Sequence, residues 1–486
     1  MGSLFISGSE ARFGALNVPG IIALPPLPNI ISEWFAIVPL TCHLATPQYD
    51  HVILGEICFL GRIPVGLFPR LGTLSGLARL LCRGQEFFDG ATTKGGISQT
   101  VWDVQWGSVF PAANGSVSAA VIQFIRSRRK PTAILMPEHY VKRGYHESRN
   151  ESSTSESTQA AKELPATMPE HYIKQDDQNS RNGSSSRESN LTAMELPVKM
   201  PEHRPQQINT RFRRYQTLHV LRFGRQEHHT SARALFRHLV TSKWFGYLSM
   251  VFKTVVAIIF YLCGLYGTAT VLLTSTISQI FANTIQLQRP CGYLENNEHH
   301  DACMPLAPHQ NALEWYLFVG DRYVVDTMLN KSMLHLILPQ QVMACWWFNV
   351  AHVLQIAAMT FTAGQKGWDA VFLVLCLVFD RIGRWYHRST QLASDWLQDE
   401  GVEVDSHTFQ FTGRAVMLGA IQLYSGTKVT MWMDDIMVPH PRRDAWLDYM
   451  KTGEITHEMS DTDIEWIERT ACLSSRAADA MAKEIH

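Results

Sequence analysis

The sequence predicts a mainly α-helical integral membrane protein, in which a small helical membrane core joins soluble N- and C-terminal regions. Two long uncharged apolar runs, a strongly basic segment before the first run and a polar repeat further upstream predict this organisation. A helix that crosses ~30 Å of hydrocarbon needs about 20 apolar residues, and both runs reach that length. The mean hydropathy of −0.08 is too low for a chain made almost entirely of membrane helices, so large polar regions must accompany a few spans.

The balance of charge argues against nucleic acid as a partner. The chain has 43 Lys and Arg against 44 Asp and Glu, a formal net charge of −1, whereas nucleic-acid-binding proteins carry a clear basic excess. Complete phosphate-binding, dinucleotide-binding and zinc-protease motifs are absent from the sequence. We therefore expect membrane lipid as the main partner and predict no metal and no cofactor.

Residues 1–130 are expected to form an N-terminal region that associates with the membrane surface. Phe59–Leu81 is apolar, but Arg62 and Pro64 interrupt any span, which favours an interfacial or packed amphipathic segment. Glu10 comes early and prolines break the following apolar stretch, so we expect no secretory signal.

Residues 131–210 are predicted to be a disordered linker built from a repeat. The motif MPEH begins at Met136, Met168 and Met200, a period of 32 residues. Each unit is mostly polar and has too few apolar residues to offset the entropy cost of ordering. The alternative is a tandem docking motif for protein partners, centred on MPEH.

Residues 211–243 form a basic juxtamembrane segment, directly before the uncharged run Thr254–Gln288. We predict one span at about 254–276; a helical hairpin is the alternative. Lys and Arg near a span favour its cytosolic side. The linker should therefore be cytosolic, and the loop from Arg289 onward should be lumenal or extracellular.

A second predicted span covers residues 343–363. Asn349, His352 and Gln355 are three residues apart, so a helix would place them on one side. Polar groups in hydrocarbon usually face the interior of a bundle. Hydrogen bonding between helices is the favoured interpretation, and a substrate or proton path that uses His352 is the alternative.

A further candidate span, at about 367–383, surrounds the apolar piece Ala370–Phe379. Ten helical residues rise only ~15 Å, so neighbouring residues must be included for it to cross. We expect a multi-pass membrane core within residues 244–393, with two or three crossings and a cytosolic N-terminus. Residues 394–486 contain no further run of that length and should form a soluble C-terminal tail.

The pair Asp434 and Asp435 within Trp432–Leu447 is a catalytic candidate, beside His352. Paired carboxylates can act as acid and base or hold magnesium. An Asp-rich diphosphate-binding motif would need another acid where Val438 stands, so helix capping is the favoured interpretation. Because no catalytic motif is complete, a non-enzymatic protein is expected.

Cys291 and Cys303 lie close together in a polar loop and are a candidate disulfide if the loop is lumenal. Glu298–Asp301 lies between them and lacks the spacing typical of metal ligands. Five Asn-X-Ser/Thr triplets are candidate N-glycosylation sites: Asn114, Asn150, Asn182, Asn190 and Asn330. On the predicted orientation Asn330 is preferred, and the other four qualify only if their segments are lumenal.

Three C-terminal blocks, QKGWDAVFLVL, STQLASDWLQDEGVEVDSHTFQFTGRAVMLGAIQLYSG and WMDDIMVPHPRRDAWL, resemble a family of uncharacterised multi-pass membrane proteins of filamentous fungi. The resemblance extends over about Trp244–Leu447. It implies a fungal membrane protein with an accessory role in a biosynthetic pathway. The alternative function is a membrane enzyme or transporter-like protein that acts on a lipophilic small molecule.

Overall fold

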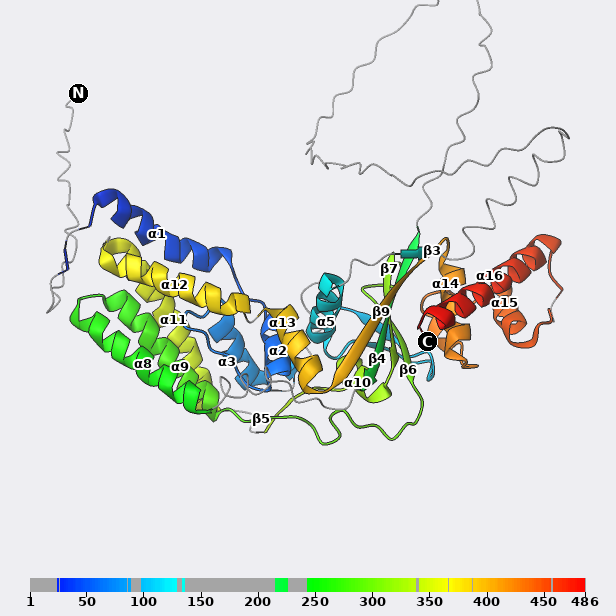
Figure 1. The fold of residues 1–486 in the computed structure, drawn as a ribbon, viewed down its shortest axis with the longest axis horizontal. Coiled ribbons are helices and arrows are strands. Elements are labelled where there is room, and N and C mark those ends of the chain that lie inside the picture. The colour runs from blue at the N-terminus through cyan, green and yellow to red at the C-terminus, as the bar shows by residue number, and fades with distance from the viewer. Residues whose placement is uncertain are drawn as a thin grey trace, which may run out of the picture. The chain divides into compact units, whose positions relative to one another are not determined.

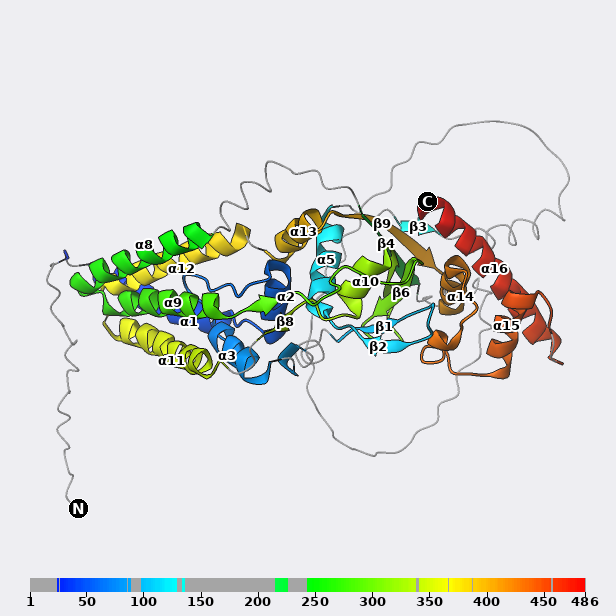
Figure 2. The ribbon, with the colours of Figure 1, turned by 90° about the horizontal axis from the view of Figure 1, so that it is seen from below.

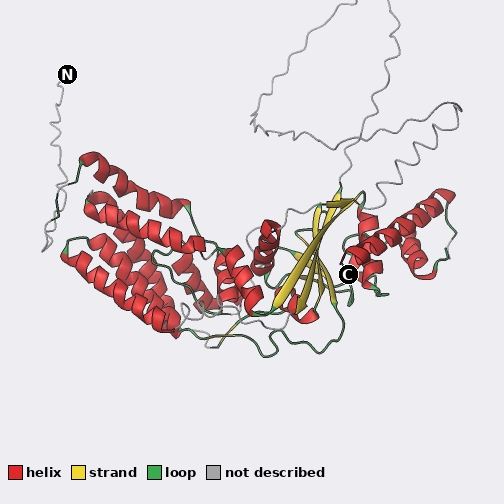
Figure 3. Cartoon of the chain, in the orientation of Figure 1, coloured by secondary structure: helices red, strands yellow, loops and turns green. Residues whose placement is uncertain are grey.

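The computed structural model describes residues 24–25, 27–84, 86–88, 98–128, 133–135, 215–225, 243–337, 341–365, 367–386, 388–455 and 458–485. These residues belong to one compact unit, from which Tyr140–Arg213 is separate. The predicted repeat linker lies outside the described residues except for Ala133–Leu135. The described chain is mainly helical, as the sequence predicts, but it also contains a large β-sheet that the sequence did not predict (Figure 3).

Seven strands form this sheet in the order β2-β1-β6-β7-β4-β9-β3 (Figure 1). The strands are β1 (Thr100–Trp102), β2 (Val109–Pro111), β3 (Ala133–Leu135), β4 (Gln216–Arg225), β6 (Ala302–Ala307), β7 (Glu314–Gly320) and β9 (Val402–Phe411). β4 runs parallel to β7, and β3 runs parallel to β9, whereas the other neighbours are antiparallel. A small second sheet pairs β5 (Leu287–Gln288) with β8 (His335–Leu336).

Helices cover both faces of the seven-stranded sheet. Successive side chains of a strand point to opposite faces, so each strand contributes to two cores. On β4, Leu218 and Val220 pack with α14 (Arg414–Ser425), α15 (Pro441–Thr452) and α16 (Asp461–Ile485). Leu221 and Phe223 face the other way, into a core shared with α2 (Asp50–Leu60), α5 (Gly115–Arg128), α10 (Arg322–Leu329) and α13 (Ser389–Asp399). We call the sheet with these seven helices the α/β region.

Two sequence predictions are corrected by this region. The segment 211–243 is not simply a juxtamembrane tether, because it contains β4, an interior strand of the sheet. Residues 394–486 are not a separate tail, because β9 and α14–α16 complete the sheet and one of its two cores. β4 and β9 do alternate along much of their length, but β4 lies in basic sequence next to an apolar run and β9 in a polar segment, so the longer-range composition was given more weight than this local pattern.

Six further helices pack into a bundle (Figure 2). They are α1 (Asn29–Ala45), α3 (Thr73–Arg83), α8 (Lys243–Leu262), α9 (Tyr266–Thr284), α11 (Val342–Gln365) and α12 (Trp368–Tyr386). The predicted span 343–363 lies within α11, and the predicted span 367–383 is close to the bounds of α12. Among the described helices, α11 alone is long and apolar enough over its length to cross a membrane, and α8 holds a shorter apolar segment, Gly246–Leu262.

The predicted span at 254–276 is wrong, because the apolar run is a hairpin of two helices. The chain turns at Cys263–Leu265 between α8 and α9, where Gly264 has φ 79°, a conformation that glycine adopts at no steric cost. The alternative prediction, a helical hairpin, is therefore the correct one; the run is longer than one crossing needs, but it carries no charge that marks the turn.

The sheet also corrects the predicted orientation. Its strands come from before α8, from between α9 and α11, and from after α12. The hairpins α8–α9 and α11–α12 therefore both leave the α/β region and return to it. The loop after Arg289 lies on the same side of the bundle as β4, not on the opposite side.

Candidate functional site

The predicted acid pair at Asp434 and Asp435 forms part of the framework of the α/β region. Asp434 accepts a hydrogen bond from Arg443 at 2.5 Å, and this arginine is almost fully buried. Asp435 accepts hydrogen bonds from Trp102 Nε1 at 3.2 Å and from Gln310 Nε2 at 2.6 Å. The two carboxylates therefore tie the turn after Met431–Met433 to α15 and to β1.

The predicted polar face of α11 is divided by the fold. Gln355 is 1% exposed, whereas Asn349 is exposed and His352 is half-buried. Gln355 Nε2 donates to the carbonyl of Pro69 at 2.6 Å. Its partner is a loop, not the neighbouring helix that the sequence suggested.

That loop, Gly61–Gly72, connects α2 to α3, and its middle is bound by side chains of the bundle. Asp380 accepts from the Phe68 backbone N–H at 3.1 Å, and Arg384 donates to the Phe68 carbonyl at 3.2 Å. Ser275 donates to the Gly66 carbonyl at 2.8 Å. Buried backbone outside helices needs such partners, because each unpaired group would cost a hydrogen bond. These polar groups of α9, α11 and α12 therefore hold the loop within the bundle.

Two histidines beside this loop have buried ring nitrogens that make no hydrogen bond to the described residues. His43 is 2% exposed and leaves both ring nitrogens unpaired, and its ring lies edge-on to Phe68 at a centroid distance of 5.7 Å. His352 leaves Nδ1 unpaired. Unpaired buried polar atoms of this kind are sites for ordered water.

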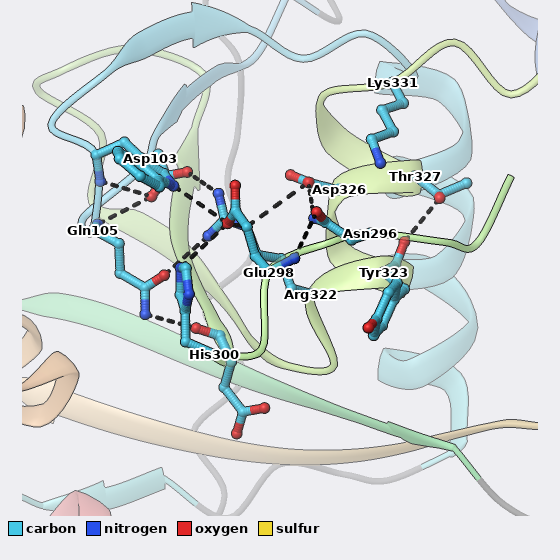
Figure 4. Close-up of polar contacts among 12 residues, drawn as sticks. Asp103, Gln105, Asn296, Glu298, His300, Arg322, Tyr323, Asp326, Thr327 and Lys331 are labelled. Carbon is cyan, nitrogen blue, oxygen red and sulfur yellow. Dashed lines mark hydrogen bonds and ion pairs between the residues drawn. The ribbon is translucent and has the colours of Figure 1, made fainter. Parts of the chain in front are cut away.

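A denser polar cluster lies at the carboxyl end of β7, centred on Arg322 (Figure 4). Arg322 opens α10 and is 4% exposed. It donates to Asp103 Oδ2 and to Gln105 Oε1, each at 2.9 Å, and forms a close ion pair with Glu298 through Nε. Buried charges of this kind require partners, and the arginine fork supplies several donors at once.

One turn further along α10, Asp326 adds a third carboxylate to this cluster. Its Oδ2 accepts from Asn296 at 2.8 Å, whereas Oδ1 is buried and makes no hydrogen bond to the described residues. Burial raises the pKa of Asp326, and the charges of Arg322 and Lys331 oppose that rise. The carboxyl group is therefore more readily protonated than an exposed aspartate.

The cluster opens into a cavity of about 380 Å³ at the carboxyl ends of β4 and β7. The lining includes Phe223, Gly320 and Tyr323 together with His300, whose Nε2 lies 3.2 Å from Glu298 Oε2. Ligands commonly bind at the carboxyl ends of parallel strands. A histidine held by a carboxylate can move a proton, and Arg322 supplies positive charge beside it.

The sequence did not single out Arg322, Asp103 or Asp326. Glu298 and His300 were interpreted as part of a polar loop. A signal was present: Arg322 comes two residues after the buried strand Glu314–Gly320, and functional side chains of α/β proteins lie at such strand ends. Among the described residues, no three His, Cys, Asp or Glu side chains come together as metal ligands.

The candidate disulfide and the glycosylation sites have different outcomes. Cys291 and Cys303 are both free thiols, and Cys303 is buried in the core under α14–α16, so the structure does not pair them. Asn114 is 5% exposed and donates to the carbonyls of Thr327 and Lys331, so the folded chain does not present it for glycosylation. Asn330 is exposed at the end of α10. Asn150, Asn182 and Asn190 lie outside the described residues.

Comparison of the chain with protein-family models, with curated proteins and with solved structures finds no match.

Proposed function

We propose that this chain is a multi-pass membrane protein in which α1, α8, α9, α11 and α12 cross the bilayer and anchor the α/β region to one side of it. The observation that supports this proposal is a set of large apolar side chains on the outside of these helices. They are Ile30, Ile31, Trp34, Ile37 and Leu44 on α1; Tyr247, Leu248, Val251, Phe252, Val255, Ile258, Ile259, Tyr261 and Leu262 on α8; Ile280 on α9; Val342, Met343, Trp346, Val353, Leu354 and Phe361 on α11; and Leu375, Val378, Phe379 and Ile382 on α12.

Exposing such a surface to water costs free energy, whereas the hydrocarbon of a bilayer solvates it. Soluble monomers rarely expose contiguous apolar patches beyond a few hundred Å². Only 39% of the most apolar stretch of α11 is buried, which is low for the core helix of a soluble protein. At 1.5 Å per residue the five helices have lengths of ~26 to ~36 Å, which are close to the thickness of the hydrocarbon core.

The fold supports one arrangement of these crossings. The hairpins α8–α9 and α11–α12 return to the α/β region, and α1 ends on that side at the connection to α2. The start of α1 lies at the far ends of the helices, because Trp368 Nε1 donates to the Pro25 carbonyl there at 2.5 Å. Five crossings therefore place the start of α1 on the side of the membrane opposite the α/β region.

The distribution of Lys and Arg favours the cytosol for the α/β region. Basic residues flank the helices on its side, including Lys243, Arg289, Arg381 and Arg388, whereas the far turn at Cys263–Leu265 has none and the one between α11 and α12 has Lys366 alone. Cytosolic flanks carry this excess. On this arrangement Asn330 is cytosolic and carries no glycan.

Alkaline carbonate extraction and glycosidase digestion together test this arrangement. We expect the full-length protein to stay in the membrane pellet and to show no shift on glycosidase treatment. An acceptor triplet placed in the turn at Cys263–Leu265 by a short insertion should become glycosylated, and one placed at the exposed Lys428, in the loop after α14, should not. Release into the soluble fraction, or a glycan on Asn330, would contradict the proposal.

Within this arrangement we propose a non-enzymatic role, as a membrane component that presents the α/β region to partners in the cytosol. The contacts of Asp434 and Asp435 support it, because both are engaged with other parts of the fold. An accessory role in a fungal biosynthetic pathway, with protein partners bound through the MPEH repeats, remains our proposal for its context. Deletion of residues 136–203 should then abolish partner capture while leaving membrane extraction unchanged.

One observation favours a second candidate function, acid–base chemistry on a small molecule. Glu298, His300 and Arg322 meet at the cavity beyond β4 and β7. If the chain is an enzyme, Glu298→Gln and His300→Asn should abolish complementation of a deletion strain at normal protein abundance. The exposed carboxylate Glu403 on β9 supplies the control, because Glu403→Gln should complement fully. Full complementation by the first two variants would remove this candidate.

A further inference from the structure

Two cysteines from distant parts of the chain lie side by side where α3 and α11 pack together. Cys82 is in the last turn of α3, and Cys345 is in the first turn of α11. Their Sγ atoms are 2.8 Å apart across a sequence separation of 263 residues. Sulfur atoms in a disulfide are about 2.05 Å apart, so a displacement of about 0.8 Å would join them.

We infer that Cys82 and Cys345 are a reversible dithiol–disulfide pair that links α3 to α11 when it is oxidised. The inference rests on the packing of these two helices and does not depend on the proposed membrane crossings. It concerns a site distinct from Cys291 and Cys303, the pair that the sequence suggested.

The packing holds the Cys345 sulfur against α3. Its Sγ lies 3.5 Å from the Ala78 carbonyl oxygen, one turn before Cys82, and 3.8 Å from Asn349 Nδ2. Because both cysteines are on regular helices that contact each other, the two sulfur atoms meet without a loop having to rearrange.

Cys82 is accessible to soluble reagents. It is exposed, whereas Cys345 is half-buried. Arg79 and Arg83 flank Cys82 on α3, and both are exposed; Arg79 pairs with Asp50 at 2.5 Å. Exposed arginines of this kind belong in water or at the membrane surface, not in hydrocarbon. The sulfur pair therefore lies at an aqueous edge of the bundle.

Other described thiols lack this combination of exposure and a partner. Burial raises the pKa of Cys58 to about 12, and burial also raises the pKa of Cys303. Both of these thiols are buried and out of reach of soluble reagents, so we expect them to stay inert. Cys472 is exposed on α16 but makes no sulfur contact with the described residues, and it serves as an internal control.

The chemistry balances with glutathione disulfide as the oxidant. The Cys82 thiolate attacks one sulfur of glutathione disulfide, which breaks the S–S bond and releases one glutathione thiolate. The Cys345 thiolate then attacks the Cys82 sulfur of this mixed disulfide and releases the second glutathione. Two protein thiols are oxidised and one glutathione disulfide is reduced to two thiols.

Oxidation would act on the loop Gly61–Gly72. The loop leads directly into α3, and Gln355 of α11 already binds its Pro69 carbonyl. A covalent bond between the end of α3 and the start of α11 would therefore join the two elements that hold this loop. The pair would therefore couple the glutathione redox potential around it to the packing of the bundle.

The test uses the full-length protein in detergent, equilibrated with glutathione buffers of increasing disulfide content. Remaining thiols are then tagged with a polyethylene-glycol maleimide and resolved by gel shift. We expect wild type to lose two tags in one concerted step as the disulfide content rises. Peptide mass spectrometry without reduction should identify Cys82 linked to Cys345, and reducing buffer should restore both tags.

Three variants make the outcome decisive. Cys82→Ser and Cys345→Ser should each remove the concerted loss of two tags, whereas Cys472→Ser should keep it. If both thiols stay fully tagged in the most oxidising buffer, the inference is overturned. It is equally overturned if Cys82 stops at a glutathione adduct while Cys345 stays free, because the mass spectrum then shows no bond between them.

Discussion

The α/β region and the helical bundle both bury charged side chains, but they use them differently. In the α/β region Arg322 binds carboxylates from three separate segments, so charged side chains satisfy one another. In the bundle Asp380, Arg384 and Gln355 bind the backbone of Gly61–Gly72, so side chains satisfy a loop. The first arrangement leaves a polar cavity at the surface, whereas the second fixes irregular chain inside an apolar layer. Buried polar residues of similar type therefore mark a candidate binding site in the α/β region, and in the bundle they hold a loop in place.

The largest effect should come from removing the counter-charge in the α/β region. Arg322→Met leaves Asp103, which is also 4% exposed, and the other carboxylates without their cation. Breaking a buried ion pair on one side costs about 3–5 kcal/mol. We expect a loss of this size in the free energy of unfolding, measured by chemical denaturation in detergent.

A matched control sits in the same region. Arg126 pairs with Glu314 at 2.6 Å, but both side chains are about half exposed. Arg126→Met should cost only ~0–1 kcal/mol, because exposed pairs contribute little. Equal losses in the two variants would mean that the Arg322 cluster is solvated and not part of the core.

An intermediate effect should come from the hydrogen bond between Gln355 and the loop Gly61–Gly72 in the bundle. Gln355→Leu removes the donor to the Pro69 carbonyl and leaves a buried acceptor unpaired, which costs about 1–3 kcal/mol. Thermal unfolding in detergent, followed by near-ultraviolet circular dichroism, measures it. Asn349→Leu, on the exposed side of the same helix, should change stability by only a few tenths of a kcal/mol. If the two variants behave alike, Gly61–Gly72 is not held by Gln355.

The sequence predicts a region well when the contacts that fix its structure join residues that are close together in the chain. α11 was predicted close to its bounds because a long uncharged run is a local signal. The α8–α9 hairpin was predicted only as the alternative to a single span, because the run stays uncharged through Gly264. Composition thus gave the coarse prediction of a membrane protein, but it did not give the number of helices in the apolar run.

The α/β region was largely invisible for a different reason. β6, ACMPLA, and β7, EWYLFVG, are buried on both faces and show no clean alternation, and β4 appeared as basic sequence before a span. Arg322 and Asp103 are 219 residues apart, so no local pattern could pair them. Asp434 and Asp435 attracted attention as neighbouring acids, yet their partners come from α15, β1 and the turn before β7. Adjacent acids in sequence proved a weaker signal than an arginine at the end of a buried strand.

The smallest effect we predict is a change in how stability varies with pH. Burial raises the pKa of Asp326 in the folded chain, so the folded state binds more protons than the unfolded state between the ordinary aspartate value, about 3.9, and that raised value. In this window the group destabilises the fold progressively as the pH rises; below it the group is protonated in both states and imposes no penalty. Asp326→Asn removes the ionisation while keeping a side chain of the same shape. Unfolding free energies measured across this window should therefore show the variant gaining stability relative to wild type as the pH increases. A difference that does not change with pH would show that Asp326 is solvated, and the contrast between a paired α/β cluster and a backbone-binding bundle would then rest on Arg322 alone.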